Sequence, residues 1–580
     1  MKGKLCCLAL CCVMVLSVIG CGSSDRQSKT SGDSVMEAEP AVNGDDIPGY
    51  EYGDHFWSDE PVTYTMFWSD HEAYPMTDSW ELFDRIAEMT NVTLDISGYS
   101  IARTDYDEKK ALMINSGETA YIIPKTYDES AFVDGGAVVA VSDWIAYMPN
   151  FTGFIEKYDL QEDLDTILKD DGKFYRLPGL KEVAEQNYTF TARKDIFDAA
   201  GYDLSELEKN WTWDDLYEVL SGVKEYMVNE GMCTENDYIW SDRWAGDDGS
   251  GGNILKLMGA SYGVPSGWAV KDGMAYDADT DSFYFAEISD NYKQYVTILN
   301  KFIDGKILDP ESFTQTDEQA CQKFYRGEAV FIGINQSVYT DYIANLNTTI
   351  GEGNYELYIV VYPKGTNDYR AENSRLENGV MIASRALKEL SEEEFIKMIR
   401  FIDWLFYSDE AFDFIKWGVK GSDYTKGETY EIVTDEASGM EIKQLLPHWY
   451  CGGLGIAQTE EDQEDMRLKL GYAGGVFWYG GTAAQLSDAY PPVLQDYFAR
   501  SADYRNNKPL DPTIRPTEDE NEQINLWKTP LIDHVKSWTL QFATGNKDID
   551  SDWDSYVDGC INLKYRELTN LYNEIYNRNK

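Results

Sequence analysis

The sequence predicts an α/β protein built from more than one lobe. Segments with strand-like and helix-like patterns alternate over residues 62–124, and such alternation is typical of a parallel sheet covered by helices. The chain has 580 residues, and the roughly 520 that follow residue 60 exceed what one hydrophobic core supports. With 43% hydrophobic residues, these lobes have enough apolar side chains to form cores of their own.

The alternation begins with a β-branched and aromatic run at 62–68, which predicts a strand. Apolar residues at helical spacing then predict a helix over 82–89, and an alternating stretch at 92–96 predicts the next strand. A second helix is expected over 107–116, where Gly117 supplies the stop. The short apolar segment 120–124 predicts a third strand. Ligands of such sheets bind beyond the carboxyl ends of the strands, which here are 67–70 and 124–127.

Further strands are predicted at 329–334, at 357–362 and at 380–383, and a helix over 391–407. The C-terminal part reads as helical, because Ile561, Tyr565, Leu568, Tyr572 and Ile575 form one apolar stripe. Such a stripe indicates packing rather than function.

The first residues have the layout of a secretory leader. Lys2 and Lys4 precede an apolar run at 5–19, which is too short for the roughly 20 residues that span a bilayer. Cys21 follows Gly20, as in a lipobox, where the cysteine becomes the lipidated N-terminus. We therefore expect a signal peptide at 1–20, a lipid anchor and polar tether at 21–60, and a location at the extracytoplasmic face of the cell membrane.

The formal net charge of −52 excludes nucleic acid as a partner, because phosphate binding needs clustered Lys and Arg. Outside the leader, the cysteines are widely spaced and form no CxxC pair, which gives no support to a zinc or redox site. Whether Cys233, Cys321, Cys451 and Cys560 form disulfides stays open, and free buried thiols are the simpler reading.

No catalytic motif is present in the sequence. HExxH, GxSxG and the Walker A loop are all missing. With 102 acidic residues, a pair of carboxylates at glycosidase spacing carries no information. The turn 277–281 resembles the start of a calcium loop, but its sixth position is Ser282 and its twelfth is Ile288. We expect no enzyme activity, no cofactor and no metal site.

The content of aromatic residues is the sequence feature that favours a particular class of ligand. The chain contains 16 Trp and 41 Tyr, many of them beside Gly, Asp or Asn in loop-like sequence. Flat apolar rings with a polar edge suit the C–H faces and hydroxyl rims of sugars. For any single ring, a place in the core is still the commoner role.

Short motifs along the chain resemble the extracellular solute-binding proteins of ABC importers, family 1, in their branch of large lipoproteins. They occur in the family's order, and the resemblance runs from about residue 62 to 576. The segments are 171–178 (DGKFYRLP), 192–201 (ARKDIFDAAG), 211–217 (WTWDDLY), 308–311 (LDPE), 324–332 (FYRGEAVFI), 417–424 and 552–556 (DWDSY).

The resemblance implies a type II periplasmic-binding-protein-like fold, with two discontinuous α/β lobes joined by a hinge around an interlobe cleft. By analogy the lobes would be 61–186 plus 378–446, and 187–377 plus 447–580. It also implies a monomer that binds an oligosaccharide and delivers it to the permease subunits of an importer.

Candidate ligand-binding residues come from strand ends, from loop aromatics and from arginines that could reach hydroxyls or carboxylates. They are Trp68, Asp70, Lys125, Tyr127, Arg193, Arg243, Trp244, Trp268, Asn335, Gln336, Arg370, Trp417 and Trp478.

Two other functions stay open at this point: a surface glycan-degrading hydrolase or lyase, and a glycan adhesin or sensor that needs no permease. The sequence also leaves open which sugar is bound, its length and its charge. The acidic body disfavours polyuronates at long range, yet a few arginines in the cleft could outweigh this.

Overall fold

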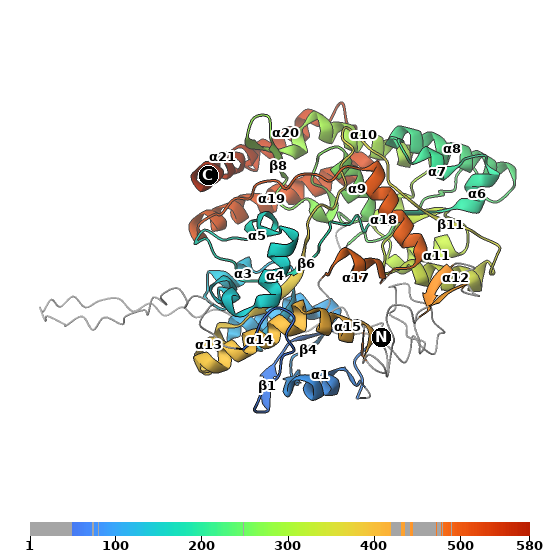
Figure 1. The fold of residues 1–580 in the computed structure, drawn as a ribbon. Coiled ribbons are helices and arrows are strands. Elements are labelled where there is room, and N and C mark those ends of the chain that lie inside the picture. The colour runs from blue at the N-terminus through green and yellow to red at the C-terminus, as the bar shows by residue number, and fades with distance from the viewer. Residues whose placement is uncertain are drawn as a thin grey trace, which may run out of the picture. The chain divides into compact units, whose positions relative to one another are not determined.

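The computed structural model describes residues 49–71, 75–78, 80–246, 249–418, 431–434, 441–444, 471–472, 477, 480–488 and 490–580. The chain divides into two units, Met1–Val42 and Asn43–Lys580. The first unit, which contains Cys21, lies outside the described residues, so everything below concerns the second (Figure 1).

The first sheet begins as predicted and is then extended by strands from other parts of the chain. β1 (Val62–Thr65) pairs in parallel with β3 (Val92–Asp95), and α1 (Leu82–Thr90) makes the crossover between them. A parallel bridge from Met66 to Ile122 brings in β5 (Ile122–Thr126). The next pairings, however, are antiparallel.

The antiparallel partner of β5 is β12 (Leu376–Ile382), which also pairs antiparallel with β6 (Leu177–Leu180). The predicted strand–helix–strand–helix–strand unit over 62–124 is therefore parallel as expected, and the sheet becomes mixed where β12 joins it. The sequence did not predict this pairing, because β12 comes from about 200 residues beyond β6, whereas crossover rules concern strands that are neighbours in sequence. A short parallel pair, β2 (Trp68–Asp70) with β4 (Ser100–Ala102), lies beyond β1.

Helix boundaries in this region follow local capping. α2 (Tyr106–Ser116) ends at Gly117, whose φ of 78° is the left-handed C-cap that glycine adopts without strain. α14 (Glu392–Tyr407) starts with a capping box between Ser391 and Glu394. Both predicted helices are confirmed.

The second sheet has the order β10-β7-β11 and is antiparallel throughout. Its central strand, β7 (Thr189–Arg193), is buried at all five positions. The flanking strands β10 (Phe331–Ile334) and β11 (Leu357–Val360) send successive side chains to opposite faces, into two different clusters of core residues.

The helices that pack in the second of these clusters are α8 (Trp213–Asn229), α9 (Asn253–Ser261), α10 (Asp290–Asp304), α19 (Glu518–Ala543), α20 (Trp553–Asn562) and α21 (Tyr565–Asn579). The C-terminal stripe predicted from the sequence supplies Leu568, Tyr572 and Ile575 to this core. Many of the chain's aromatic residues also lie in this core or in the other cores. Trp213, Trp240 and Trp404, for example, are fully buried.

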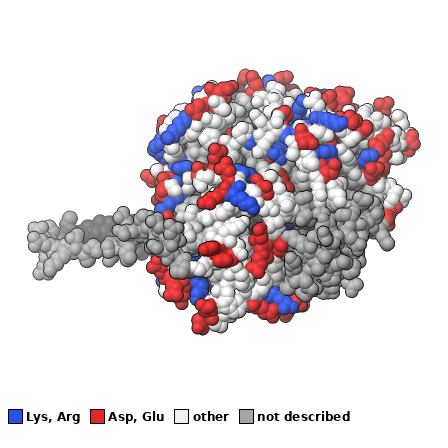
Figure 2. All heavy atoms as spheres, viewed as in Figure 1, with Lys and Arg blue, Asp and Glu red and all other residues white. Residues whose placement is uncertain are grey.

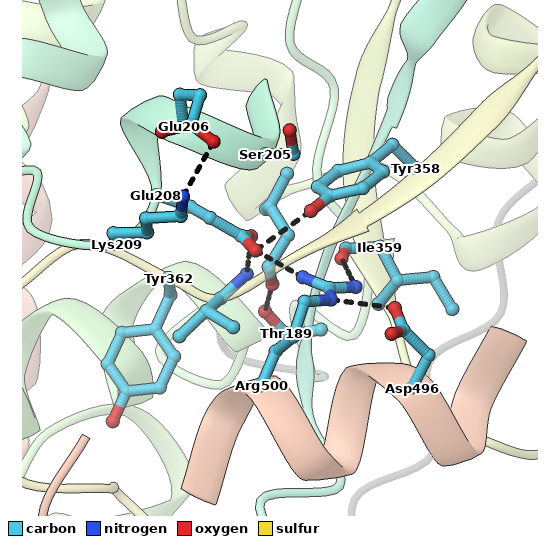
Figure 3. Close-up of polar contacts among 12 residues, drawn as sticks. Thr189, Ser205, Glu206, Glu208, Lys209, Tyr358, Ile359, Tyr362, Asp496 and Arg500 are labelled. Carbon is cyan, nitrogen blue, oxygen red and sulfur yellow. Dashed lines mark hydrogen bonds and ion pairs between the residues drawn. The ribbon is translucent and has the colours of Figure 1, made fainter. Parts of the chain in front are cut away.

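Helix α18 (Pro492–Tyr504) is fastened to the second sheet by a buried ion pair (Figure 3). Arg500 binds the fully buried carboxylate of Glu208, which also accepts hydrogen bonds from Tyr358 Oη at 2.8 Å and from the Val361 amide at 2.7 Å. Burial raises the pKa of Glu208, while the Arg500 guanidinium lowers it. The pair fixes α18 to β11.

Two chain segments, 181–188 and 370–377, run side by side between the sheets. The Lys181 amide donates to Arg375 O at 2.8 Å, and the Glu372 amide donates to Gln186 Oε1 at 3.0 Å. Arg375 is held in turn by the buried carboxylate of Asp163. We call these the crossing segments, because they connect β6 to β7 and β11 to β12.

The remaining helices and strands are shorter or more peripheral. They are α3 (Ser130–Val133), α4 (Pro149–Tyr158), α5 (Gln161–Asp165), α6 (Lys194–Ala199), α7 (Leu204–Leu207), β8 (Met274–Asp277), β9 (Ser282–Phe285), α11 (Asp317–Tyr325), α12 (Tyr339–Thr349), α13 (Ser384–Glu389), α15 (Asp409–Trp417), β13 (Glu431–Thr434), β14 (Glu441–Gln444) and α17 (Ala483–Asp488). In the part of the chain that the structure describes, no helix combines the length and apolarity needed to cross a membrane. The lobe boundaries stay a prediction.

Candidate functional site

Three aromatic rings from separate parts of the chain meet where the first crossing segment ends. Tyr188, which precedes β7, lies with its ring centroid 5.2 Å from Trp244 and 5.2 Å from Trp268. Both contacts are edge-to-face, with interplanar angles of 78° and 63°. Trp268 is 42% exposed, and the other two rings are half-buried. We call Tyr188, Trp244 and Trp268 the aromatic group.

The position of Trp268 depends on the glycine before it. Gly267 has a φ of 58°, and a Cβ there would lie 3.0 Å from Lys256 N and 3.1 Å from Gly252 O. Only glycine accepts both the left-handed backbone and this close approach to α9. Residues 267–269 then form a 3₁₀ turn that presents the indole beside Tyr188.

The ammonium of a lysine on α9 lies over two rings of the aromatic group. Lys256 Nζ lies 4.8 Å from the centroid of Tyr188 and 5.2 Å from that of Trp268. The same ammonium forms an ion pair with Glu372 in the second crossing segment. Glu372 Oε2 also accepts the amides of Asn187 at 2.6 Å and Tyr188 at 3.2 Å. One carboxylate therefore joins both crossing segments to the lysine beneath the aromatic group.

The start of α9 is fixed by a buried carboxylate. Asp242 Oδ2 accepts the Ile254 amide at 2.9 Å, at the helix N-terminus, and its Oδ1 accepts the Gly333 amide at 2.9 Å in β10. Burial raises the pKa of Asp242 to about 7, and these amide hydrogen bonds act in the opposite direction. Trp244 lies two residues further along the same loop, so Asp242 aligns α9, β10 and the loop that carries this ring.

Amide side chains lie next to the rings. The backbone amide of Gln336 donates to the side-chain oxygen Oδ1 of Asn187 at 3.0 Å, and the Tyr188 phenol is hydrogen-bonded to the side chain of Asn335. Gln336 Oε1 is buried and has no partner among the described residues. A buried acceptor without a partner is costly, which makes this oxygen a natural site for a ligand hydroxyl or a water.

The carboxyl end of β5 approaches the same region. Tyr127 is 56% exposed, and its phenol contributes to the raised pKa of Tyr188, where burial is the larger cause. Lys125, two residues earlier, is half-buried and has a left-handed backbone with φ of 56°. The first sheet thus adds an exposed ring within electrostatic range of Tyr188.

Several residues expected from the sequence do not reach the aromatic group. Trp68 is 2% exposed and packs against Trp80, Phe83 and Phe477 in the core. The remaining expected residues are placed as follows: Asp70 accepts the Met76 amide at 2.8 Å, Arg193 pairs with Asp195 at the far end of β7, Arg370 donates to Ala184 O at 2.9 Å, and the side chains of Trp417 and Trp478 lie outside the described residues.

The expected residues that do come together are Trp244, Trp268, Arg243, Asn335 and Gln336, with Tyr127 close by. The guanidinium of Arg243 stacks on Trp244 at 4.5 Å. Sequence reasoning missed Tyr188, Lys256 and Glu372. A signal existed only for Tyr188, which stands directly before a strongly apolar strand.

A cavity of about 540 Å³ borders the crossing segments elsewhere. Charged and polar side chains dominate its walls, and Phe498 is the aromatic residue among them. Arg370 lines this cavity rather than the aromatic group. Because a sugar ring needs flat apolar faces beside its hydroxyl partners, we assign the candidate site to the aromatic group.

The chemistry of the site is that of recognition. Rings supply apolar faces, Asn335 and Gln336 supply amide donors and acceptors, and the Lys256–Glu372 pair holds the arrangement rigid. Within the described residues, no group of three or more His, Cys, Asp or Glu could hold a metal ion. Cys233, Cys321 and Cys560 are free thiols, and Cys451 lies outside the described residues.

Known structures share this fold. The calcium-free alginate-binding protein AlgQ2 is similar over 91% of this chain and 100% of its own, with 16% identity and a TM-score of 0.63. The substrate-binding protein FusA of S. pneumoniae, in complex with kestose, is similar over 89% and 99%, with 18% identity and a TM-score of 0.60. A human-milk-oligosaccharide (HMO)-binding protein associated with an ABC transporter of Bifidobacterium longum infantis is similar over 90% and 99%, with 12% identity and a TM-score of 0.64.

A search among curated protein sequences finds no match to the chain. The family described as bacterial extracellular solute-binding protein matches residues 81–399, more than half of the chain. This family and the similar structures are binding proteins rather than enzymes. The mixed α/β architecture agrees with the periplasmic-binding-protein-like fold expected from the motifs. The chain belongs to the bacterial extracellular solute-binding protein family.

Proposed function

We propose that this protein captures an oligosaccharide at the aromatic group and delivers it to the permease of an ABC importer. The observation that carries the proposal is the meeting of Tyr188, Trp244 and Trp268 beside the amides of Asn335 and Gln336. Rings arranged edge to face expose apolar surface on more than one side, which suits a ligand of several sugar units.

The structural relatives support the choice of ligand class. FusA is described in complex with kestose and with fructo-nystose, AlgQ2 as binding alginate, and the B. longum infantis protein as binding human milk oligosaccharides. Each of these ligands is a chain of sugars. Their diversity leaves the particular glycan of this protein to experiment.

The test is calorimetric titration of the mature protein with a panel of oligosaccharides of two to six units. Saturable one-to-one binding of at least one member is expected. If none of the panel binds, the assignment of a sugar ligand is refuted.

We further propose that the protein is held at the outer face of the membrane by lipid on Cys21, and that it serves transport. A Cys21→Ser variant should lose partition into detergent and incorporation of labelled palmitate, while the wild type retains both. Cellular uptake of the bound sugar should stop when the gene is deleted and return with the wild-type gene. Uptake that persists after deletion would instead favour the adhesin or sensor function.

A further inference from the structure

We propose that the site selects uncharged glycans over uronates and other acidic sugars, because the cations around the aromatic group are neutralised within the protein. This inference rests on the proposed function and goes beyond it by naming the charge class of the ligand. Both cations at the rings, Lys256 and Arg243, carry the argument.

Lys256 is already committed to protein partners. Its side chain is only 10% exposed, the ammonium is paired with Glu372, and two ring faces cover it at 4.8 and 5.2 Å. Glu372 is fixed by the amides of Asn187 and Tyr188, so it does not move away easily. A ligand carboxylate would have to displace this network to reach the ammonium.

Arg243 is committed in the same way. Its side chain is 12% exposed, Nη2 binds Asp317 Oδ2 at 3.0 Å, and Nη1 donates to Tyr342 Oη at 3.1 Å. The guanidinium plane is also covered by Trp244. Asp317 accepts the Trp244 amide at 2.8 Å with its other oxygen, which locks the carboxylate in place.

Two other cations are also held in ion pairs. Lys181 in the first crossing segment is paired with Glu377. Arg193 binds Asp195 through both Nε and Nη2, at the end of β7 away from Tyr188. Lys256, Arg243, Lys181 and Arg193 could therefore each bind a ligand carboxylate only by giving up an existing ion pair.

The electrostatic environment of the aromatic group also disfavours an acidic ligand. Burial raises the pKa of the Tyr188 phenol, and the carboxylates of Glu372 and Glu377 raise it further. On the face shown in Figure 2, acidic side chains are spread over the described surface with lysines and arginines scattered among them. The net charge of −52 adds repulsion at distances up to the screening length of about 8 Å.

The first experiment compares ligands that differ only in charge. Oligogalacturonides and alginate oligomers are titrated before and after reduction of their carboxylates to alcohols, together with neutral gluco-, fructo- and galacto-oligosaccharides. Neutral members should bind at least about tenfold more tightly than the acidic ones, a difference of about 1.4 kcal/mol.

An acidic oligomer that binds as well as its reduced form, or better, would overturn the inference while leaving sugar binding intact. Absence of binding to every sugar would instead refute the proposed function, and this inference with it. The two failures are therefore distinguishable.

The second experiment frees one cation. Asp317→Asn keeps an oxygen for the Trp244 amide but removes the charge that neutralises Arg243, and it should shift the acidic-to-neutral affinity ratio about tenfold toward acidic sugars. Glu372→Gln should shift the ratio the same way through Lys256, as a second route if the first variant is poorly folded.

The control variant is Asp198→Asn, which removes the same charge from the Lys194–Asp198 pair on α6. It lies beyond the far end of β7 and should leave the ratio unchanged. If both variants at the site also leave the ratio unchanged, internal neutralisation does not set the selectivity and the inference is wrong.

Discussion

Replacement of Trp268 by alanine removes the most exposed ring of the aromatic group and should weaken sugar binding about tenfold. A Trp side chain covers up to about 250 Å² when fully buried. With 42% of Trp268 exposed, about 100 Å² remains for a ligand, and one sugar face covers about half of it. At about 25 cal/mol per Å², this contact contributes about 1.3 kcal/mol.

The assay is calorimetric titration of the wild type and Trp268→Ala with the tightest oligosaccharide of the panel. Trp57→Ala is the matched control, because Trp57 is 54% exposed but lies before β1, outside the aromatic group. The control should bind as the wild type does. Equal affinity of Trp268→Ala and the wild type, with unchanged melting temperatures, would refute the assignment of the site.

Three further predictions concern the frame around the site. Gly267→Ala should weaken sugar binding and lower the melting temperature, because the new Cβ strains a left-handed backbone against α9. Differential scanning fluorimetry measures the melting temperature, and the same calorimetric titration measures the binding. Arg500→Ala should cost about 3–5 kcal/mol in urea denaturation by leaving Glu208 buried and unpaired, whereas Arg578→Ala at an exposed pair should cost less than about 1 kcal/mol. Burial raises the pKa of Asp403 to about 7, above its unfolded value of 3.8, so its contribution to stability is largest at low pH and is lost as pH rises from about 4 to about 7. Asp403→Asn should therefore lose less stability than the wild type between pH 5 and pH 8, and parallel losses in the two proteins would contradict this.

The local rules of capping and periodicity predicted helices well. α2 ends at Gly117, and α14 begins at the capping box of Ser391 and Glu394, since such signals act within one helical turn. These local rules do not predict which strands pair with each other. β12 enters the first sheet from a distant part of the sequence, and nothing in its own residues states which strand it will pair with.

The residues of the candidate site likewise divide into those that the local sequence predicts and those that depend on contacts between distant segments. Trp244 and Trp268 were found because glycine and polar neighbours mark them as loop residues. Trp68 shares the aromatic character, but a strand-end position does not reveal which face of the sheet its ring occupies. Lys256 and Glu372 look like ordinary charges in the sequence, because their pairing depends on α9 meeting a crossing segment more than 100 residues away.

The Asn187 and Tyr188 amides are bonded to the side chain of Glu372 rather than to a neighbouring strand. Their protection from hydrogen exchange consequently depends on the two crossing segments staying together, not on the unfolding of a sheet. Deuterium uptake of a peptide that covers these two amides therefore reports how often the two crossing segments separate. Comparing its deuterium uptake with and without sugar measures how far ligand binding slows that motion.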